Sequence, residues 1–203
     1  MEPNCIALYR KMLTCRRLEE AIAALWHEGR ISGEMHLGIG EEGINVGVLD
    51  HLGEGDAVAL DHRGTAGMVL RGVDPVAVVK ECLGDEDGLC RGMGGHMHLF
   101  SREHLAASSG IVGAAGPTAC GFALAAQHLR PGKIAAAFFG EAAMNQGMLM
   151  EAMNLAAVWE LPVLFVCRDN GVAITTDSAS VTGGDLEERA RELGVSGRKV
   201  DGS

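Results

Sequence analysis

Two short apolar runs with a helical pattern between them dominate the second half of the chain. Residues 133–139 (KIAAAFF) and 161–167 (LPVLFVC) are rich in hydrophobic side chains, and small or polar residues follow each run. The intervening segment has the length of a strand–helix–strand crossover, which makes the two strands parallel. We therefore predict an α/β fold, with a parallel sheet flanked by helices on both faces and residues 1–203 forming a single domain.

The pattern along the rest of the chain predicts further elements around this unit. Asp74 is the expected N-cap of a helix that starts at Pro75. Residues 84–110 are expected to be irregular, and a loop of that length inside a compact domain is usually functional. The remaining expected helices lie at 4–29, 44–52, 113–129 and 185–193, and the remaining expected strands at 56–60 and 198–200. Because the sequence stops just after 198–200, we expect either material from another chain beside this strand or a truncation.

Two polar side chains follow the two apolar strands. Glu141 comes after the first strand and Asn170 after the second. Ligands of open parallel sheets bind at the carboxyl ends of the strands, and neighbouring strands lie about 4.8 Å apart. One Mg²⁺ with oxygen ligands at roughly 2.1 Å could lie between them. A helix expected to start near Met144 would direct free N–H groups to the same place and attract phosphate. A helix cap and a turn residue are the alternative interpretation.

Composition and charge narrow the class of protein. Hydrophobic residues make up 47% of the 203 residues, which argues against disorder, and the net charge of −10 argues against nucleic acid as a partner. No apolar run is long enough for a membrane helix, and the N-terminus has no signal-peptide core. The six cysteines form no C-x-x-C pair, so we expect reduced thiols in a cytoplasmic protein.

Five further features allow both a functional and a structural interpretation. Gly38–Gly43 matches G-x-G-x-x-G, but no strand is expected before it, so a turn before a helix is favoured over a dinucleotide site. Cys90 and three histidines share one loop, although their spacing matches no usual zinc pattern. Arg63 is either a phosphate-binding or a surface residue. Residues 109–113 either start a helix or offer main-chain groups to a heterocycle, and His36 is either structural or catalytic.

Taken together, several stretches resemble the alpha subunit of thiamine-diphosphate-dependent 2-oxo acid dehydrogenases, and most closely the acetoin and pyruvate branch. The stretches are HLGIGEEG, DHRG, GMGGHMHLF, GIVGAAGP, FFGEAAMNQG, EAMNLAAVWELPVLFV and DNG. The resemblance implies the thiamine-diphosphate-binding fold, with Mg²⁺ bound by Glu141, Asn170 and the main-chain carbonyl of Val172. It implies that His36 is catalytic and faces the substrate. The cofactor-binding residues that it implies are His62, Arg63, Gly110, Val112, Glu141, Ala142, Ala143 and Asn170.

The resemblance also implies a reaction and partners. Thiamine diphosphate cleaves a carbon–carbon bond next to a carbonyl group of a small 2-oxo acid, and the acyl unit passes to a lipoyl or carrier-protein acceptor. A beta-type subunit supplies the activating glutamate within an α2β2 assembly. The alternatives are a transketolase-like transfer of a two-carbon ketol unit from a ketose to a carrier thiol, and a subunit that only scaffolds its partner.

Three departures from the family pattern are visible. The chain has Gly140-Glu141-Ala142 where the family has Gly-Asp-Gly, and Thr65 where the family usually has a histidine. Family subunits also continue well beyond the last residue of this sequence. We expect that a separate chain supplies that part, that the reaction does without it, or that the subunit has degenerated.

Overall fold

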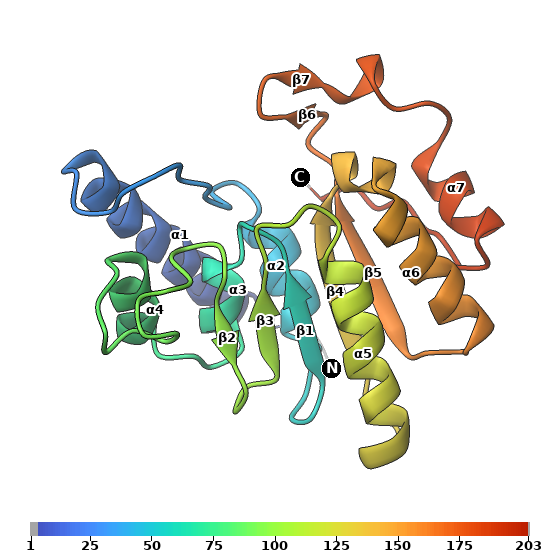
Figure 1. Ribbon diagram of the computed structural model, residues 1–203, viewed down its shortest axis with the longest axis horizontal. Helices are drawn as coiled ribbons and strands as arrows, with labels where there is room; N and C mark the ends of the chain where they lie inside the picture. The colour runs from blue at the N-terminus through green and yellow to red at the C-terminus, as the bar shows by residue number, and fades with distance from the viewer. Residues whose placement is uncertain (1–3, 203) are drawn as a thin grey trace. The chain divides into compact units, whose positions relative to one another are not determined.

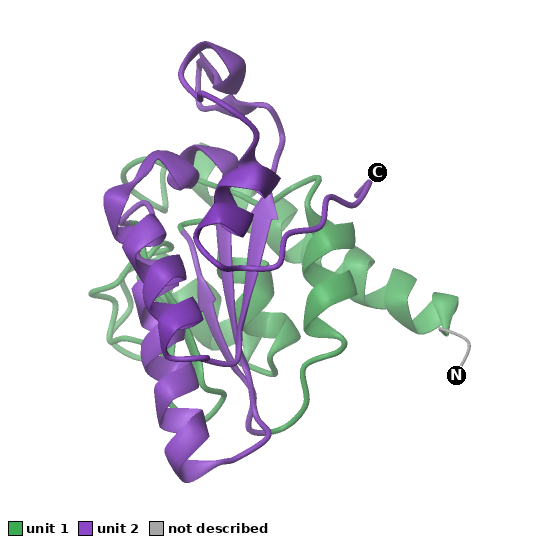
Figure 2. Ribbon diagram, turned by 90° about the vertical axis from the view of Figure 1, so that its right-hand side faces the viewer, with its two compact units in different colours: residues 1–54, 62–110, 203 green, residues 55–61, 111–202 purple. Residues whose placement is uncertain are grey.

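The computed structural model describes residues 4–202, which fall into two compact units (Figures 1 and 2). The first unit contains the described residues up to 54 together with 62–110, and the second contains 55–61 and 111–202. The prediction of a single domain over 1–203 stays a prediction. None of the helices in the described part of the chain is long and apolar enough to cross a membrane.

Three parallel strands form the centre of the second unit. They are β1 (Ala57–Leu60), β4 (Ala135–Gly140) and β5 (Val163–Arg168), and β4 lies between the other two. The register places Gly140 opposite Arg168, so the carboxyl ends of β4 and β5 are level with each other. The strands predicted from the two apolar runs are confirmed, and so is their parallel pairing.

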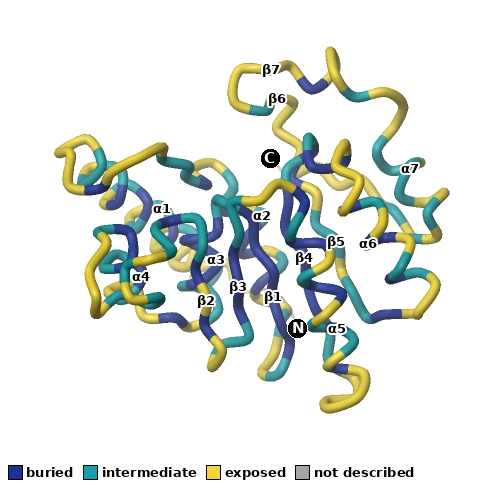
Figure 3. Tube along the Cα trace, in the orientation of Figure 1, coloured by how far each residue is buried: buried dark blue, intermediate teal, exposed yellow. Residues whose placement is uncertain are grey.

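Small side chains allow two helices of the second unit to pack closely. Helix α5 (Ala115–Leu129) contacts β1, β4 and the next helix, α6 (Gly147–Val158). Strand β4 is buried almost throughout, including both of its phenylalanines (Figure 3). The remaining elements of this unit are η1 (Glu141–Asn145), β6 (Val172–Ala173), β7 (Thr176–Asp177), η2 (Ser178–Ser180) and α7 (Leu186–Glu192).

Two predictions for the second unit were wrong in detail. The helix expected from about Met144 is a 3-10 turn, η1, followed by an α-helix that begins only at Gly147. The break lies at Gln146, whose extended backbone (φ −90°, ψ 127°) interrupts the helix. The strand expected at 198–200 is absent, and all three of its residues are exposed. A single valine flanked by polar residues offers too little apolar surface to bury a strand.

The first unit is mainly helical. Its longest helix, α1 (Cys5–His27), contacts the other three, α2 (Glu42–Leu49), α3 (Thr65–Leu70) and α4 (Pro75–Cys82). The predicted start of α4 is confirmed, because the carboxylate of Asp74 accepts the Val76 N–H at 3.0 Å. Helix α2 begins two residues earlier than the range predicted for it, at Glu42 rather than at 44. Apolar side chains of α1 form buried clusters with its neighbours.

The long loop after α4 is organised by one buried carboxylate. Glu81, at 0% exposure, accepts the main-chain N–H groups of Cys90 (2.6 Å), Gly92 (2.8 Å) and Gly94 (2.6 Å). A side chain at Gly94 would collide with the carbonyl of His98, so this position requires glycine. The loop is not wholly irregular as predicted, because β2 (Phe100–Ser101) and β3 (Ala106–Ser108) pair antiparallel within it.

Candidate functional site

The carboxyl ends of β4 and β5 bring together two of the polar residues that the sequence analysis selected. Glu141 follows β4 directly, and Asn170 lies two residues beyond β5. The amide oxygen of Asn170 accepts the N–H of Val172 at 3.0 Å, so the segment from 169 to 172 is a compact turn. An amide oxygen has two lone pairs, so Asn170 can accept this bond and still bind a cation.

The Glu141 carboxylate is buried without a basic partner. Its residue is 3% exposed, and the Ser178 hydroxyl donates a hydrogen bond to Oε1. No lysine, arginine or histidine among the described residues forms an ion pair with Glu141, and no described residue donates to Oε2. A buried carboxylate is costly unless another charge compensates it, and a hard cation bound by oxygen ligands provides that charge. The side chains present therefore fit a Mg²⁺ ion.

Main-chain groups next to Glu141 fit an anion. No side chain caps the N-terminus of η1 or of α6, so no capping side chain accepts a hydrogen bond from the first main-chain N–H groups of these helices. Ala142 is half-buried and Ala143 is buried, and neither carries a side chain large enough to cover these groups. Such uncapped N–H groups are typical phosphate ligands. The residues around 141–147 thus suit a diphosphate accompanied by a metal ion.

A buried ion pair lies beside this region, at the ends of β1 and β5. Arg168 Nη2 and Asp61 Oδ2 are 2.5 Å apart, with side-chain exposures of 3% and 11%. The Arg168 guanidinium also lies 5.8 Å from the centre of the Phe138 ring, within the range of a cation–π contact. The pair links the outer two of the three parallel strands. It fixes the chain two residues before Asn170.

In the first unit, three histidine rings form a cluster. The ring of His36 makes an edge contact with His62, with centroids 4.9 Å apart, and lies 5.9 Å from the ring of His96. The Nε2 atom of His96 accepts the main-chain N–H of His36 at 3.2 Å, which requires that nitrogen to be unprotonated. Arg63 donates to the carbonyl of Leu37, next to His36. Three predicted site residues, His36, His62 and Arg63, therefore lie in one small region of this unit.

Burial of His96 predicts a dependence of stability on pH. Desolvation, together with the nearby His36, His62 and His98, lowers the pKa of His96 to about 4. His96 therefore becomes protonated near pH 6.5 in the unfolded chain but only near pH 4 in the folded chain. We expect the free energy of unfolding to fall by on the order of 3 kcal/mol across this window as the pH is lowered. Chemical denaturation at several pH values measures it.

A matched pair of variants isolates this contribution. H96N should lose most of the acid-dependent fall, because asparagine does not titrate. H51N, at an exposed histidine, should keep it. An H96N variant whose stability falls with acid as steeply as that of the parent would show that His96 is not the group responsible.

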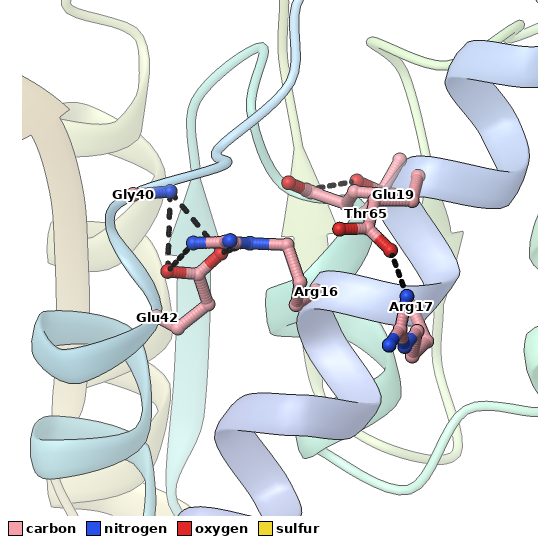
Figure 4. Close-up of polar contacts among 7 residues, drawn as sticks. Arg16, Arg17, Glu19, Gly40, Glu42 and Thr65 are labelled. Carbon is pink, nitrogen blue, oxygen red and sulfur yellow. Dashed lines mark hydrogen bonds and ion pairs between the residues drawn. The ribbon is translucent and has the colours of Figure 1, made fainter.

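The G-x-G-x-x-G motif is a turn that its own glutamate closes (Figure 4). The Glu42 carboxylate accepts the N–H of Gly40 at 3.1 Å and binds Arg16 through Nε (2.6 Å) and Nη2 (3.1 Å). No strand precedes the motif in the described chain. The interpretation as a turn before a helix is confirmed. With Gly40 already bound, the motif has no N–H there for a pyrophosphate.

Thr65, where a histidine was expected from the resemblance, supports the same region. Its hydroxyl donates to Oε1 of Glu19 at 2.7 Å (Figure 4). Glu19 is only 1% exposed, and this burial raises the pKa of its carboxyl group. Glu19 thus connects α1 to the start of α3.

The remaining candidates from the sequence are the residues of the long loop and the main-chain groups before α5. Cys90 Sγ accepts the N–H of Phe100 at 3.3 Å, and His104 hydrogen-bonds Ser101 at 2.8 Å. Within the described residues, no group of three or more His, Cys, Asp or Glu side chains is arranged to hold a metal. Gly110 is half-buried in the first unit, and Val112 is 45% exposed in the turn that precedes α5.

Two residues with structural importance, Glu81 and Ser178, were not selected from the sequence, and a third, His96, was selected for a different role. Glu81 lies in the last turn of α4, directly before a glycine-rich loop, and that position could have identified it. His96 was considered only as one of the loop histidines that could bind zinc, and no sequence pattern indicated its hydrogen bond to the backbone of His36. Ser178 lies in the polar run TTDSAS, where nothing distinguishes it from the adjacent serine and threonines. Only the fold shows that Ser178 contacts Glu141.

Parallel strands with an acid and an amide after their carboxyl ends are typical of α/β proteins, which bind ligands at that edge of the sheet. The chain belongs to the dehydrogenase E1 component family, whose model matches residues 10–203. The resemblance stated from the sequence is thereby confirmed, and with it the thiamine-diphosphate-binding fold.

Named relatives cover nearly all of this chain. It is 43% identical over 200 residues to the alpha subunit of acetoin:2,6-dichlorophenolindophenol oxidoreductase from Cupriavidus necator. It is 40% identical over 200 residues to the pyruvate dehydrogenase E1 component subunit alpha from Zymomonas mobilis. These matches cover 98% and 97% of this chain but only 60% and 56% of the two relatives. The chain thus spans a little over half the length of these relatives.

Proposed function

We propose that this chain is the thiamine-diphosphate- and Mg²⁺-binding alpha-type subunit of a heteromeric 2-oxo acid or acetoin dehydrogenase. The observation that carries the proposal is the buried Glu141 carboxylate, which has no basic partner among the described residues and lies at the strand ends beside the Asn170 turn. Family membership and the names of the relatives support the choice of cofactor and reaction.

The second unit would hold the diphosphate and the metal. Side-chain oxygens of Glu141 and Asn170, with the main-chain carbonyl of Val172, would bind Mg²⁺. Uncapped N–H groups near Ala142 and Ala143 would accept the diphosphate. When bound, thiamine diphosphate supplies a nucleophilic ring carbon that attacks a carbonyl group and stores the electrons released by carbon–carbon cleavage.

The first unit and the turn before α5 would supply the remaining roles. By the family resemblance, His62 and Arg63 contact the cofactor, and main-chain groups of Gly110 and Val112 hold its aminopyrimidine. His36 would face the substrate. The contact between the His36 and His62 rings orients both, and the hydrogen bond from the His36 N–H to His96 fixes the backbone of the catalytic candidate.

The proposal includes partners. A beta-type subunit would supply the glutamate that activates the cofactor, within an α2β2 assembly in the cytoplasm, and a lipoyl group would accept the acyl unit. This chain alone should therefore bind the cofactor without turning over. Activity should depend on addition of the partner.

Product analysis of the assembled complex tests the reaction. We expect carbon dioxide from pyruvate or acetaldehyde from acetoin, with either process dependent on thiamine diphosphate. Ketol transfer from a ketose phosphate, without release of carbon dioxide from pyruvate, would contradict the dehydrogenase assignment and favour a transketolase-like enzyme.

A further inference from the structure

Ser178 forms hydrogen bonds to both segments that carry the proposed metal ligands. Its hydroxyl donates to Oε1 of Glu141, and its main-chain N–H donates to the carbonyl of Gly171 at 3.0 Å. Gly171 lies between Asn170 and Val172 in the chain. Ser178 and Glu141 are 8% and 3% exposed, so little water competes for their bond. One residue thus joins the turn after β5 to the carboxylate after β4.

The position of Ser178 is itself fixed by hydrogen bonds on each side. Val172 pairs with Asp177 in the β6–β7 ladder, immediately before Ser178. The carbonyl of Ser178 accepts the N–H of Thr182 at 2.9 Å, and the Thr182 hydroxyl accepts a bond from Asn145 at 2.9 Å. Asn145 ends η1, which begins at Glu141. The segment around Ser178 is therefore connected back to the element that carries Glu141.

The length of the Glu141 side chain matches this arrangement. Glutamate places its carboxylate one methylene, roughly 1.5 Å, farther from the backbone than the aspartate expected from the family pattern. In this chain the carboxylate at that distance reaches the Ser178 hydroxyl, and Oε2 stays available to a cation. The chain thus has both a longer side chain at 141 and a hydrogen-bond donor, Ser178, that fixes it.

We propose that Ser178 is a positioning residue that holds Glu141 and the Asn170–Val172 turn together as one metal-binding unit. Glu141 and Ser178 act as a matched pair, in which the hydroxyl orients the longer carboxylate toward the cation. This inference rests on the proposed function, because it concerns the residues assigned there to the metal. Hydrogen bonds of this kind to a ligating carboxylate typically change metal affinity by 10–100-fold.

Binding of Mn²⁺ in the presence of thiamine diphosphate tests the pairing without reference to turnover. Electron paramagnetic resonance of the native complex reports free and bound Mn²⁺. S178A should weaken Mn²⁺ binding about tenfold or more, whereas S178T, which keeps the hydroxyl, should restore most of it. S180A is the matched control, because among the described residues the exposed Ser180 hydroxyl donates to the carbonyl of Asp177 alone, and Mn²⁺ affinity should not change.

A double-mutant cycle tests whether the two residues act together. E141D removes the methylene and should bind Mn²⁺ weakly. Adding S178A to E141D should then reduce Mn²⁺ affinity much less than S178A does in the parent chain, because the effects of substituting two residues in contact are not additive. Equal losses in both backgrounds would overturn the matched pair.

Failure of the inference and failure of the proposed function give different results. If the parent binds Mn²⁺ with thiamine diphosphate and S178A binds equally well, Ser178 has no positioning role and the proposed function stands. If S178A misfolds, the Mn²⁺ affinity of S178T is compared with that of the parent. If S178T folds but loses as much Mn²⁺ affinity as E141D does, the inference is overturned. If the parent itself binds no Mn²⁺, both the function and the inference are wrong.

Discussion

Replacing Asp61 by asparagine is expected to lower the free energy of unfolding by about 3–5 kcal/mol, because it leaves the buried Arg168 guanidinium without its carboxylate. Arg168 is only 3% exposed at its side chain, so water cannot take the place of Asp61. Urea denaturation of D61N and the parent measures the difference. The predicted loss is a large fraction of the free energy of unfolding of a typical domain, which is about 5–15 kcal/mol.

Two control variants separate the buried charge from general damage. K80M breaks the exposed pair between Lys80 and Asp87, whose side chains are 36% and 75% exposed, and should cost less than about 1 kcal/mol. The double variant D61L/R168M removes both buried charges and should recover much of the stability lost in D61N. If D61N were as stable as the parent, the ion pair would not support the strand ends.

Replacing Asn170 by alanine is expected to abolish cofactor-dependent activity, with a loss of at least about a hundredfold in the assembled complex. The variant removes an oxygen proposed to bind Mg²⁺ and the bond that closes the turn on Val172. Steady-state kinetics over a range of Mg²⁺ and thiamine diphosphate concentrations would show a higher requirement for metal. A simple loss of folding would instead appear in the circular dichroism spectrum.

The neighbouring residue provides the control for this prediction. Asp169 Oδ1 accepts the N–H of Gly171 at 3.0 Å, so it supports the same turn from the adjacent position. D169N keeps an oxygen that can accept this bond and should retain most of the activity. Unchanged activity in N170A would refute the metal role of Asn170, and equal losses in both variants would point to the turn rather than to a ligand.

Much of the second unit could be predicted from the sequence because local patterns there agree with the tertiary structure. The apolar runs before Glu141 and Asn170 are parallel strands, the first buried and the second partly exposed, and a crossover of that length permits few other connections. Asp185, the first residue of the helix range predicted at 185–193, caps that helix, and in the first unit Asp74 caps its helix as predicted. These features depend on neighbouring residues, so a reader of the sequence can find them.

The contacts that complete the candidate site could not be predicted in the same way. Ser178 is 37 residues from Glu141, and no local pattern indicates that their side chains meet. The bond between His96 and the backbone of His36 joins residues 60 positions apart. The strand expected at 198–200 failed for the opposite reason, because a local pattern existed without a surface to bury it. Long-range packing decides such cases.

Isothermal calorimetry of thiamine diphosphate binding, with and without Mg²⁺, tests the central claim most directly. The native complex and the chain alone should both bind the cofactor, and removal of Mg²⁺ with a chelator should abolish or greatly weaken the binding. Since the proposal places the diphosphate and metal ligands in this chain, E141A should lose the part of the cofactor affinity that depends on Mg²⁺. Absence of binding to the complex at any Mg²⁺ concentration would contradict the proposed function.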